Sequence, residues 1–314
     1  MRSPSRIERS SLRTKPMPEI ACRLRGAVTV RSLLREAEQS LRVAGLAASR
    51  ADAEWLLAGV LEVSRLQLYL LEEAIDDVLA ERFRRQVVAR IGGAPLQYLT
   101  GFTEFCSHRL AVDERVLIPR PETERLVELL IPRLRGRNAP VRVLELGTGS
   151  GAIAIALCAA VEACHVTAVE LSWIAFQVAN ANVQAHRMGD RIALVQTDWT
   201  RGVRGRFDVI VSNPPYLASE ELARLPADVQ REPRMSLDGG SDGLVFYRRL
   251  LKEIPRLAAP GAVIALECGE EQARGLEALW RAQPWTEAVS VEPDLAGRPR
   301  ALFIEISKHS EASG

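Results

Sequence analysis

A predicted strand that runs into three closely spaced glycines constrains this chain more than any other feature. Residues 141–146 are apolar, Gly147, Gly149 and Gly151 follow, and residues 152–160 have a helical pattern. Glu170 ends the next predicted strand, 19 residues after Gly151. A strand, a glycine turn, a helix and a second strand that ends in an acid are typical of an open α/β sheet, which binds ligands beyond the carboxyl ends of its strands.

The same alternation continues to the end of the chain. We predict strands over 166–170, 192–195, 207–212 and 262–267, and helices over 172–186 and 244–257. Residues 287–292 and 301–307 read instead as an antiparallel hairpin. Residues 121–308 therefore predict a Rossmann-like α/β domain, with a mostly parallel sheet and an antiparallel C-terminal hairpin.

The residues before this domain have a different pattern. Between residues 28 and 93 the apolar residues follow helical spacing, which predicts a small bundle of four helices. Ser49 with Asp52 and Ser64 with Gln67 predict capped starts for the second and third helices. Residues 94–120 read as a connector with short β pieces at 102–105 and 109–112.

Charge and apolar content exclude several classes of protein. The 314 residues hold 41 Lys and Arg against 40 Asp and Glu, a balance that argues against binding nucleic acid by bulk charge. No apolar run reaches the length of a membrane span, which is about 20 residues. The five cysteines are scattered without metal-ligand spacing, so we expect no metal site, and reduced thiols in a cytoplasmic protein.

The first 27 residues stand apart in charge. They hold seven basic residues against two glutamates, a net charge of +5, and the remainder of the chain is −4. We predict a disordered basic tail, or sequence upstream of a misassigned start codon, and we predict a second tail at 309–314. An organellar targeting segment within residues 1–27 stays open as an alternative.

The glycine loop predicts a nucleotide-like ligand without choosing one. Residues 147–151 let a ligand lie against bare backbone, and a carboxylate at Glu170 suits two ribose hydroxyls. S-adenosylmethionine needs these two features and an adenine slot. Asp198 could accept the adenine amine and Trp199 could form an aromatic wall, although Trp199 could also be a core residue. The loop also fits a loose dinucleotide fingerprint.

Asn213-Pro214-Pro215-Tyr216 follows a buried-type strand and indicates which chemical group the site accepts. The two prolines lack backbone N–H donors, which leaves the loop carbonyls as acceptors. The side chain of Asn213 adds an acceptor and Tyr216 adds a flat face, so the loop suits a planar group that bears NH₂. The nitrogen of such a group is a poor nucleophile, and two accepted hydrogen bonds would aim its lone pair at a sulfonium methyl. In isolation the four residues could also be a plain turn.

Together these segments resemble the HemK/PrmC family over residues 29–307. That family comprises S-adenosylmethionine-dependent methyltransferases of the glutamine amide in class-1 peptide chain release factors. The segments that carry the resemblance are Pro95 to Gly101 with Phe105, Leu117 to Glu124, Glu145 to Gly151, Asn213 to Tyr216, Glu232-Pro233, Leu237 to Leu244, Leu266-Glu267 with Gly269 and Gln272, and Asp294 with Gly297 and Arg300.

The resemblance implies an enzyme, a cofactor and a partner. It implies methyl transfer from S-adenosylmethionine, without a metal, to the glutamine of a Gly-Gly-Gln loop. The helical domain would help to dock the release factor, and the protein would act as a monomer without contacting nucleic acid or membrane. The implied cofactor residues are Gly147, Thr148, Gly149, Ser150, Gly151, Glu170, Asp198, Trp199 and Asn213. The implied substrate residues are Asn213, Pro214, Pro215 and Tyr216, of which Asn213, Pro214 and Tyr216 would be catalytic. At Glu170 many relatives have Asp.

Other functions stay open at this point. Cys106-Ser107-His108 and residues 112–117 also resemble a sister family that methylates a glutamine of a large-subunit ribosomal protein, although that family tends to lack the continuation Pro119 to Glu124. Amine groups of DNA or RNA bases would fit the same Asn-Pro-Pro-Tyr geometry. A non-catalytic nucleotide-binding protein predicts an eroded site, and a nicotinamide dehydrogenase leaves residues 213–216 unexplained.

Overall fold

The computed structural model describes residues 28–71, 74–135 and 140–308. The tails predicted at 1–27 and 309–314 lie outside these residues. The described residues divide into two compact units, with the border between Arg85 and Gln86. Their border falls inside one continuous helix, α4 (Asp77–Ile91), so no break in the sequence pattern marks it. The border predicted after residue 93, where Gly92-Gly93 follows that helix, stays a prediction.

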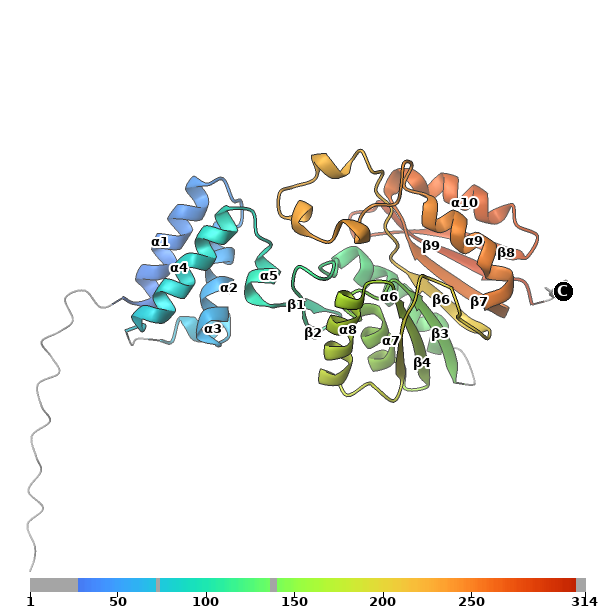
Figure 1. Ribbon diagram of the computed structural model, residues 1–314, viewed down its shortest axis with the longest axis horizontal. Helices are drawn as coiled ribbons and strands as arrows, with labels where there is room; N and C mark the ends of the chain where they lie inside the picture. The colour runs from blue at the N-terminus through green and yellow to red at the C-terminus, as the bar shows by residue number, and fades with distance from the viewer. Residues whose placement is uncertain (1–27, 72–73, 136–139, 309–314) are drawn as a thin grey trace, which may run out of the picture. The chain divides into compact units, whose positions relative to one another are not determined.

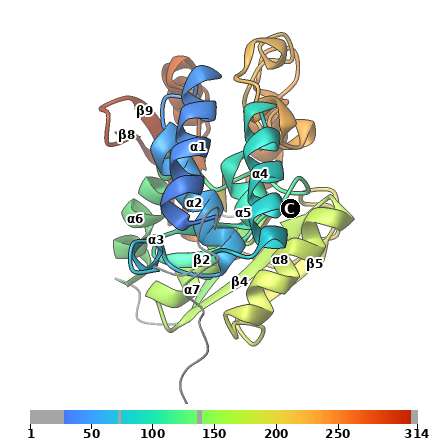
Figure 2. The same ribbon diagram turned by 90° about the vertical axis from the view of Figure 1, so that its left-hand side faces the viewer.

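The first unit is a small helical bundle. It contains α1 (Val30–Val43), α2 (Ser49–Leu61), α3 (Arg65–Leu68) and the beginning of α4. Helices α1, α2 and α4 lie side by side in both views (Figures 1 and 2). Their apolar faces form its core, which includes Leu33, Leu34, Leu41, Leu56, Leu57, Leu68 and Phe83.

Of the two predicted capped helix starts, one is present in the structure and the other is not. Ser64 and Gln67 form the predicted capping box of α3. The capped start predicted at Ser49 is wrong, because Ser49 is already helical and Ala48 occupies the cap position without a side-chain hydrogen bond. At the start of α2, the Asp52 N–H donates to the Ala48 carbonyl over 2.9 Å.

The second unit begins with the connector. This comprises α5 (Leu96–Thr100) and the antiparallel pair β1 (Phe102–Phe105) and β2 (His108–Ala111), close to the short β pieces predicted there. The α/β part that follows comprises α6 (Pro121–Arg135), β3 (Val141–Leu146), α7 (Ala152–Ala160), β4 (Cys164–Glu170), α8 (Trp173–Ala185), β5 (Ile192–Gln196), β6 (Phe207–Ser212), α9 (Val245–Leu257), β7 (Ala258–Glu267), α10 (Ala273–Arg281), β8 (Thr286–Pro293) and β9 (Pro299–Ile306).

Seven strands form one sheet, in the order β5-β4-β3-β6-β7-β9-β8 (Figure 1). Strands β3 to β7 are parallel, and β9 is antiparallel to both β7 and β8. The predicted fold class, a class I methyltransferase-type α/β fold with an antiparallel C-terminal hairpin, is confirmed. Chain order proceeds outward from β3 in one direction and from β6 in the other. The switch point where such sheets bind ligands therefore lies between β3 and β6.

Helices cover both faces of the sheet. Side chains of α6, α7 and α8 pack on one face, and those of α9 and α10 pack on the other. Neighbouring residues of one strand alternate between the two cores, as Val143 and Leu144 of β3 do. Among the residues that the structure describes, no helix combines the length and the apolar character that crossing a membrane requires.

Candidate active site

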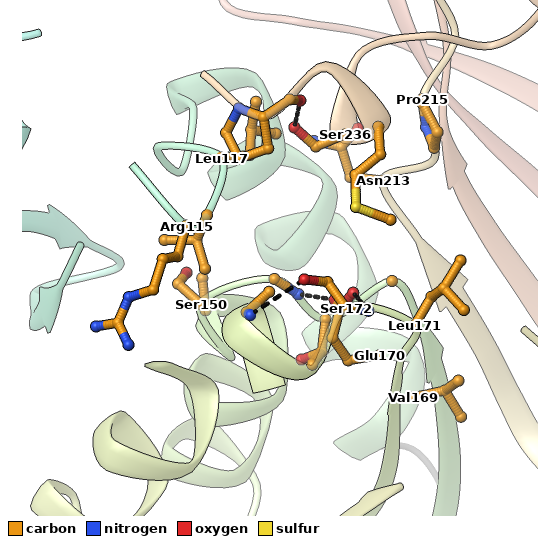
Figure 3. A pocket seen from close by; sticks show the side chains of 18 of the residues that line it. Arg115, Leu117, Ser150, Val169, Glu170, Leu171, Ser172, Asn213, Pro215 and Ser236 are labelled. Atoms are coloured by element: carbon orange, nitrogen blue, oxygen red, sulfur yellow. Dashed lines mark hydrogen bonds between the residues drawn. The ribbon is translucent and has the colours of Figure 1, made fainter. Parts of the chain in front are cut away.

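A cavity of about 410 Å³ lies at the carboxyl ends of the central strands. The loops after β3, β4 and β6 contribute to its wall, as do residues 114–119, residues 233–238 and α9. In Figure 3, Glu170 and Ser172 lie across the cavity from Asn213, Pro215 and Ser236. The two motifs that the sequence analysis treated separately, the glycine loop and Asn-Pro-Pro-Tyr, thus border one cavity at the predicted switch point.

The glycine loop after β3 leaves open space where side chains would otherwise lie. Gly147 and Gly149 have φ angles of 74° and 57°, a region that strongly favours glycine. A Cβ at either position would meet no atom within 4 Å. The N–H groups of Gly147 and Thr148 both donate to the Val169 carbonyl over 2.9 Å, which ties the loop to the end of β4. The loop is therefore rigid and open toward the cavity.

Glu170 holds the neighbouring loops together from its place at the end of β4. Its Oε2 accepts the N–H of Gly149 and its Oε1 accepts the N–H of Ser172, each over 2.9 Å (Figure 3). A carboxylate has about four acceptor positions, so each oxygen keeps capacity for one more donor. Two oxygens side by side in this state suit two neighbouring hydroxyl groups.

Glu145 is a further carboxylate that lines the cavity. It lies in the apolar strand β3 and accepts a hydrogen bond from Thr148 Oγ1 over 2.8 Å. Burial raises the pKa of its carboxyl group to about 8, against the effect of the Thr148 hydrogen bond. An acid at a buried position of this strand was the signal that could have identified it, since a lone carboxylate is costly to bury.

An aromatic pair forms another part of the wall. Trp199 stacks on Phe246 of α9, with ring centroids 4.4 Å apart, and both residues line the cavity. Trp199 is 7% exposed and belongs to the core, as one interpretation expected, and its contact with an adenine stays a prediction. Phe246 was missed, because it is brought to the site by a helix 47 residues further along the chain.

Asp198 is placed differently from its neighbour Trp199. Its carboxylate accepts a hydrogen bond from Arg249 Nη1 over 2.7 Å, and this pair lowers the pKa of Asp198. Asp198 is not among the residues that line the cavity. Its predicted contact with an adenine amine stays a prediction.

The Asn-Pro-Pro-Tyr loop is supported from behind by a second glycine-rich segment. A Cβ at Gly239 would lie 2.7 Å from the Pro215 carbonyl oxygen, and one at Gly243 would lie 2.2 Å from that of Tyr216. Gln272 Nε2 also donates to the Tyr216 carbonyl over 2.8 Å. Only glycine allows this close backbone approach, which gives residues 238–244 a structural role that their sequence alone did not reveal.

Residues 114–119, which form another wall, are fastened on two sides. Tyr98 donates its hydroxyl proton to the Val116 carbonyl over 2.6 Å. The buried carboxylate of Glu232 accepts the Ile118 N–H over 3.0 Å and forms an ion pair with Arg120. Glu232 thus links this wall to the segment that follows the Asn-Pro-Pro-Tyr loop.

Comparison with known proteins places this architecture in a family. Residues 32–101 match the PrmC N-terminal domain and residues 123–240 match the Methyltransferase small domain. A release factor glutamine methyltransferase of Moorella thermoacetica is 40% identical over 278 residues, which cover 88% of this chain and 98% of the relative. The chain belongs to the release factor glutamine methyltransferases.

Further relatives agree with this assignment. A release factor glutamine methyltransferase of Deinococcus radiodurans is 38% identical over 273 residues, 86% of this chain and 96% of the relative. Among solved structures, the hMettl16 catalytic domain in complex with an RNA hairpin has a TM-score of 0.52 and 19% identity, over 75% of this chain and 84% of that one. At that identity the likeness shows a shared fold alone.

The release factor glutamine methyltransferase fold brings together most of the predicted site. The predicted residues that line the cavity are Gly147, Thr148, Gly149, Ser150, Glu170, Trp199, Asn213 and Pro215. Those that do not line it are Gly151, Asp198, Pro214 and Tyr216. Within the described ranges, no group of three or more His, Cys, Asp or Glu side chains is arranged to hold a metal ion.

Proposed function

We propose that this release factor glutamine methyltransferase transfers a methyl group from S-adenosylmethionine to the side-chain amide nitrogen of the glutamine in the Gly-Gly-Gln motif of class-1 release factors. The observation that carries the proposal is the shared cavity. A cofactor-type glycine loop and Asn213 border the same space, so a methyl donor and an amide acceptor would meet there.

The cavity fits S-adenosylmethionine in shape and in polar groups. Its volume of about 410 Å³ is in the range of small-molecule sites. We assign the ribose hydroxyls to Glu170, the methionine part to residues 147–151, and the adenine to the wall formed by Trp199 and Phe246. The open space beside Gly147 and Gly149, which both line the cavity, supports this assignment because it leaves room for a ligand.

The Asn-Pro-Pro-Tyr loop would activate the glutamine amide. Asn213 Oδ1 would accept one amide N–H, and a proline carbonyl of the loop would accept the other. Both hydrogen bonds increase electron density on the nitrogen and orient its lone pair. The nitrogen then forms a bond to the methyl carbon while the carbon–sulfur bond breaks, and the amide proton leaves to solvent or to a loop carbonyl. Tyr216 would pack against the plane of the amide.

The proposal also covers where the release factor docks and where the enzyme acts. We assign release factor docking to the helical unit, and we expect the enzyme to act as a monomer in the cytoplasm, where release factors work, without binding nucleic acid or membrane. There are two alternative substrates to the release factor: a glutamine of a large-subunit ribosomal protein and the amine of a nucleic-acid base.

One assay separates these substrates. The purified protein and labelled S-adenosylmethionine would be offered a release factor, ribosomal protein and nucleic acid, with mass spectrometry of the products. We expect one methyl group on the Gly-Gly-Gln glutamine. Label on ribosomal protein alone, or on nucleic acid, would refute the release factor as substrate.

Asn213→Ala tests the role of the loop. Removing one acceptor that acts mainly in the transition state should lower kcat by about 100- to 1,000-fold. The Kd of S-adenosylmethionine, measured by calorimetry, should change by about threefold or less. Asn180→Ala, at an exposed position of α8, is the matched control and should leave both values unchanged. Equal losses of kcat and cofactor affinity in Asn213→Ala would contradict the amide-orienting role.

A further inference from the structure

A buried hydrogen-bond chain leads from the Asn-Pro-Pro-Tyr loop to a carboxylate outside the cavity. Asn213 Nδ2 donates to Thr123 Oγ1 over 2.9 Å, and Thr123 Oγ1 donates to Glu267 Oε2 over 2.5 Å. Tyr216 donates its hydroxyl proton to the other carboxylate oxygen, Oε1, over 3.3 Å. Glu267 is 1% exposed and Thr123 is 4% exposed, so the bond between these two side chains is buried.

The sheet explains why these residues meet. Asn213 follows β6 directly and Glu267 ends β7, and the two parallel strands pair with Ser212 opposite Leu266. The two side chains therefore leave neighbouring strands at the same edge. Thr123 lies in the first turn of α6 and inserts its hydroxyl between them.

The number of protons available to Asn213, Thr123 and Glu267 determines which group donates in each of their hydrogen bonds. A threonine hydroxyl has a single proton, and an ionised carboxylate can only accept. When Glu267 is ionised, Thr123 must give its proton to Glu267, and its oxygen can then only accept from Asn213. Asn213 must accordingly turn its NH₂ group toward Thr123, which leaves Oδ1 for another donor.

We propose that Glu267 is a positioning residue whose charge, relayed by the hydroxyl of Thr123, holds the Asn213 amide with its oxygen available to the substrate. The proposal rests on the proposed role of Asn213 as the acceptor of the glutamine amide. It adds the reason why Asn213 presents an acceptor, although an asparagine amide could equally present its NH₂ group.

Protonation of Glu267 would remove this constraint. A protonated carboxyl can donate to Thr123 Oγ1, which frees the threonine proton to point at Asn213. Either orientation of the Asn213 amide can then form a hydrogen bond with Thr123. In one of them Asn213 presents its own NH₂ group to the NH₂ group of the substrate. The Asn213 acceptor is thus enforced only while Glu267 is charged.

The surroundings bring this titration near neutral pH. Burial raises the pKa of Glu267 to about 7; the Thr123 and Tyr216 hydrogen bonds and the charge of Arg300 on β9 lower it, and Glu122 on α6 raises it. Arg300 is itself 4.0 Å from Asp294.

Two further groups adjoin the carboxylate. From α9, Tyr247 donates its hydroxyl to the Glu267 backbone carbonyl over 2.7 Å, and burial raises the pKa of Tyr247 well above its usual value. Burial also raises the pKa of the adjacent Cys268 thiol to about 12. Both groups therefore stay neutral in the range where Glu267 titrates.

Variants of Thr123 separate positioning from mere packing. Thr123→Val keeps the branched shape and removes the relay, so we expect kcat to fall by about 10- to 100-fold while the Kd of S-adenosylmethionine changes by about threefold or less. Thr123→Ser restores the hydroxyl and should retain most of the wild-type kcat. Thr200→Val, at another buried threonine, controls for the loss of a hydroxyl in the core. Equal kcat values in Thr123→Val and the wild type would overturn the proposal, as would equal losses in Thr123→Val and Thr123→Ser.

The pH profile gives a second, independent readout. The wild-type kcat should rise with pH around pH 7, and Glu267→Gln should lack this limb because it cannot ionise. Glu145, with a pKa of about 8, can add a limb of its own, which Glu267→Gln would leave in place. A limb near pH 7 that persists in Glu267→Gln would contradict the assignment.

A spectroscopic test does not depend on the identity of the substrate. The chain has four asparagines, so ¹⁵N-asparagine labelling gives few side-chain NH₂ signals, and Asn213→Ala identifies the one of interest. We expect that signal to shift with pH in the wild type, with a midpoint near 7, and to stay constant in Glu267→Gln. An invariant wild-type signal would overturn the inference, whereas a release factor that is not methylated would refute the proposed function alone.

Discussion

The helical unit and the methyltransferase unit each bury glutamates, but they surround them with different partners. In the helical unit, Glu54 forms ion pairs with Arg50 and Arg65 and accepts the hydroxyl of Tyr69. In the methyltransferase unit, Glu267 accepts two hydroxyls and Glu170 accepts two backbone N–H groups.

The partners decide what each glutamate can do. Burial by itself would raise the pKa of Glu54, but the hydrogen bonds from Arg65, Tyr69 and Arg50 lower it to about 2. Neutral donors do not offset burial in the same way, and the pKa of Glu267 is raised to about 7. Glu54 is thus permanently charged and structural, whereas the glutamates near the cavity keep free acceptor positions or an adjustable charge. The comparison separates carboxylates that stabilise the fold from carboxylates that serve the site.

The largest test of this contrast concerns Glu170. If its spare acceptor positions bind the ribose, Glu170→Ala should weaken S-adenosylmethionine binding by about 10- to 100-fold, which corresponds to about 1.5–3 kcal/mol for hydrogen bonds to a charged group. Calorimetry measures the effect. Glu162→Ala, at an exposed position after α7, is the control. A Kd unchanged in Glu170→Ala would leave the carboxylate with only its loop-fastening role.

Glu54→Gln tests the structural role of the buried carboxylate in the helical unit. Losing the charge leaves two arginines without their shared partner, so the free energy of unfolding should fall by about 2 kcal/mol. Cofactor affinity and kcat on a small glutamine peptide should not change. Urea unfolding and calorimetry provide the two measurements. A loss of cofactor affinity without a loss of stability would contradict the structural role of Glu54.

The smallest expected effect is an opposite response of the two units to pH. Glu54, with its pKa lowered to about 2, contributes stability that is present above its unfolded pKa of 4.5 and is lost as pH falls toward 2. Glu267, with its pKa raised to about 7, contributes stability that is present below 4.5 and is lost as pH rises through 7.

Hydrogen exchange measured separately on peptides of each unit can resolve this difference. Between pH 5 and pH 8 we expect protection in the β6–β7 region to decrease, after correction for intrinsic exchange, and protection in α2 to stay constant. Glu267→Gln should reduce the decrease, and the part that persists belongs to Glu145, whose pKa of about 8 gives it the same direction of pH dependence. The same trend in both units would show that the two carboxylates are not distinguished by their partners.

Local sequence was enough for much of this molecule. Alternating strand and helix patterns predicted the α/β fold and its antiparallel end, because the apolar period of each segment is set by its own secondary structure. The glycine loop and Asn-Pro-Pro-Tyr were recognisable because positive φ angles and missing N–H donors depend on residue type alone. The capped start at Ser49 failed because a short polar pattern does not determine which residue takes the cap position.

Other features depended on which distant residues the fold brings together. Thr123, Glu267 and Phe246 join the site from α6, β7 and α9, and nothing in their immediate neighbours signals that arrangement. The pairing of Asp198 with Arg249 likewise required the two segments to meet. The fold class and the two motifs of the site follow from local chemistry and can be read from the residues in order. The charge and the hydrogen-bond direction around Asn213 depend on the folded molecule, because burial and proton count involve every neighbour at once.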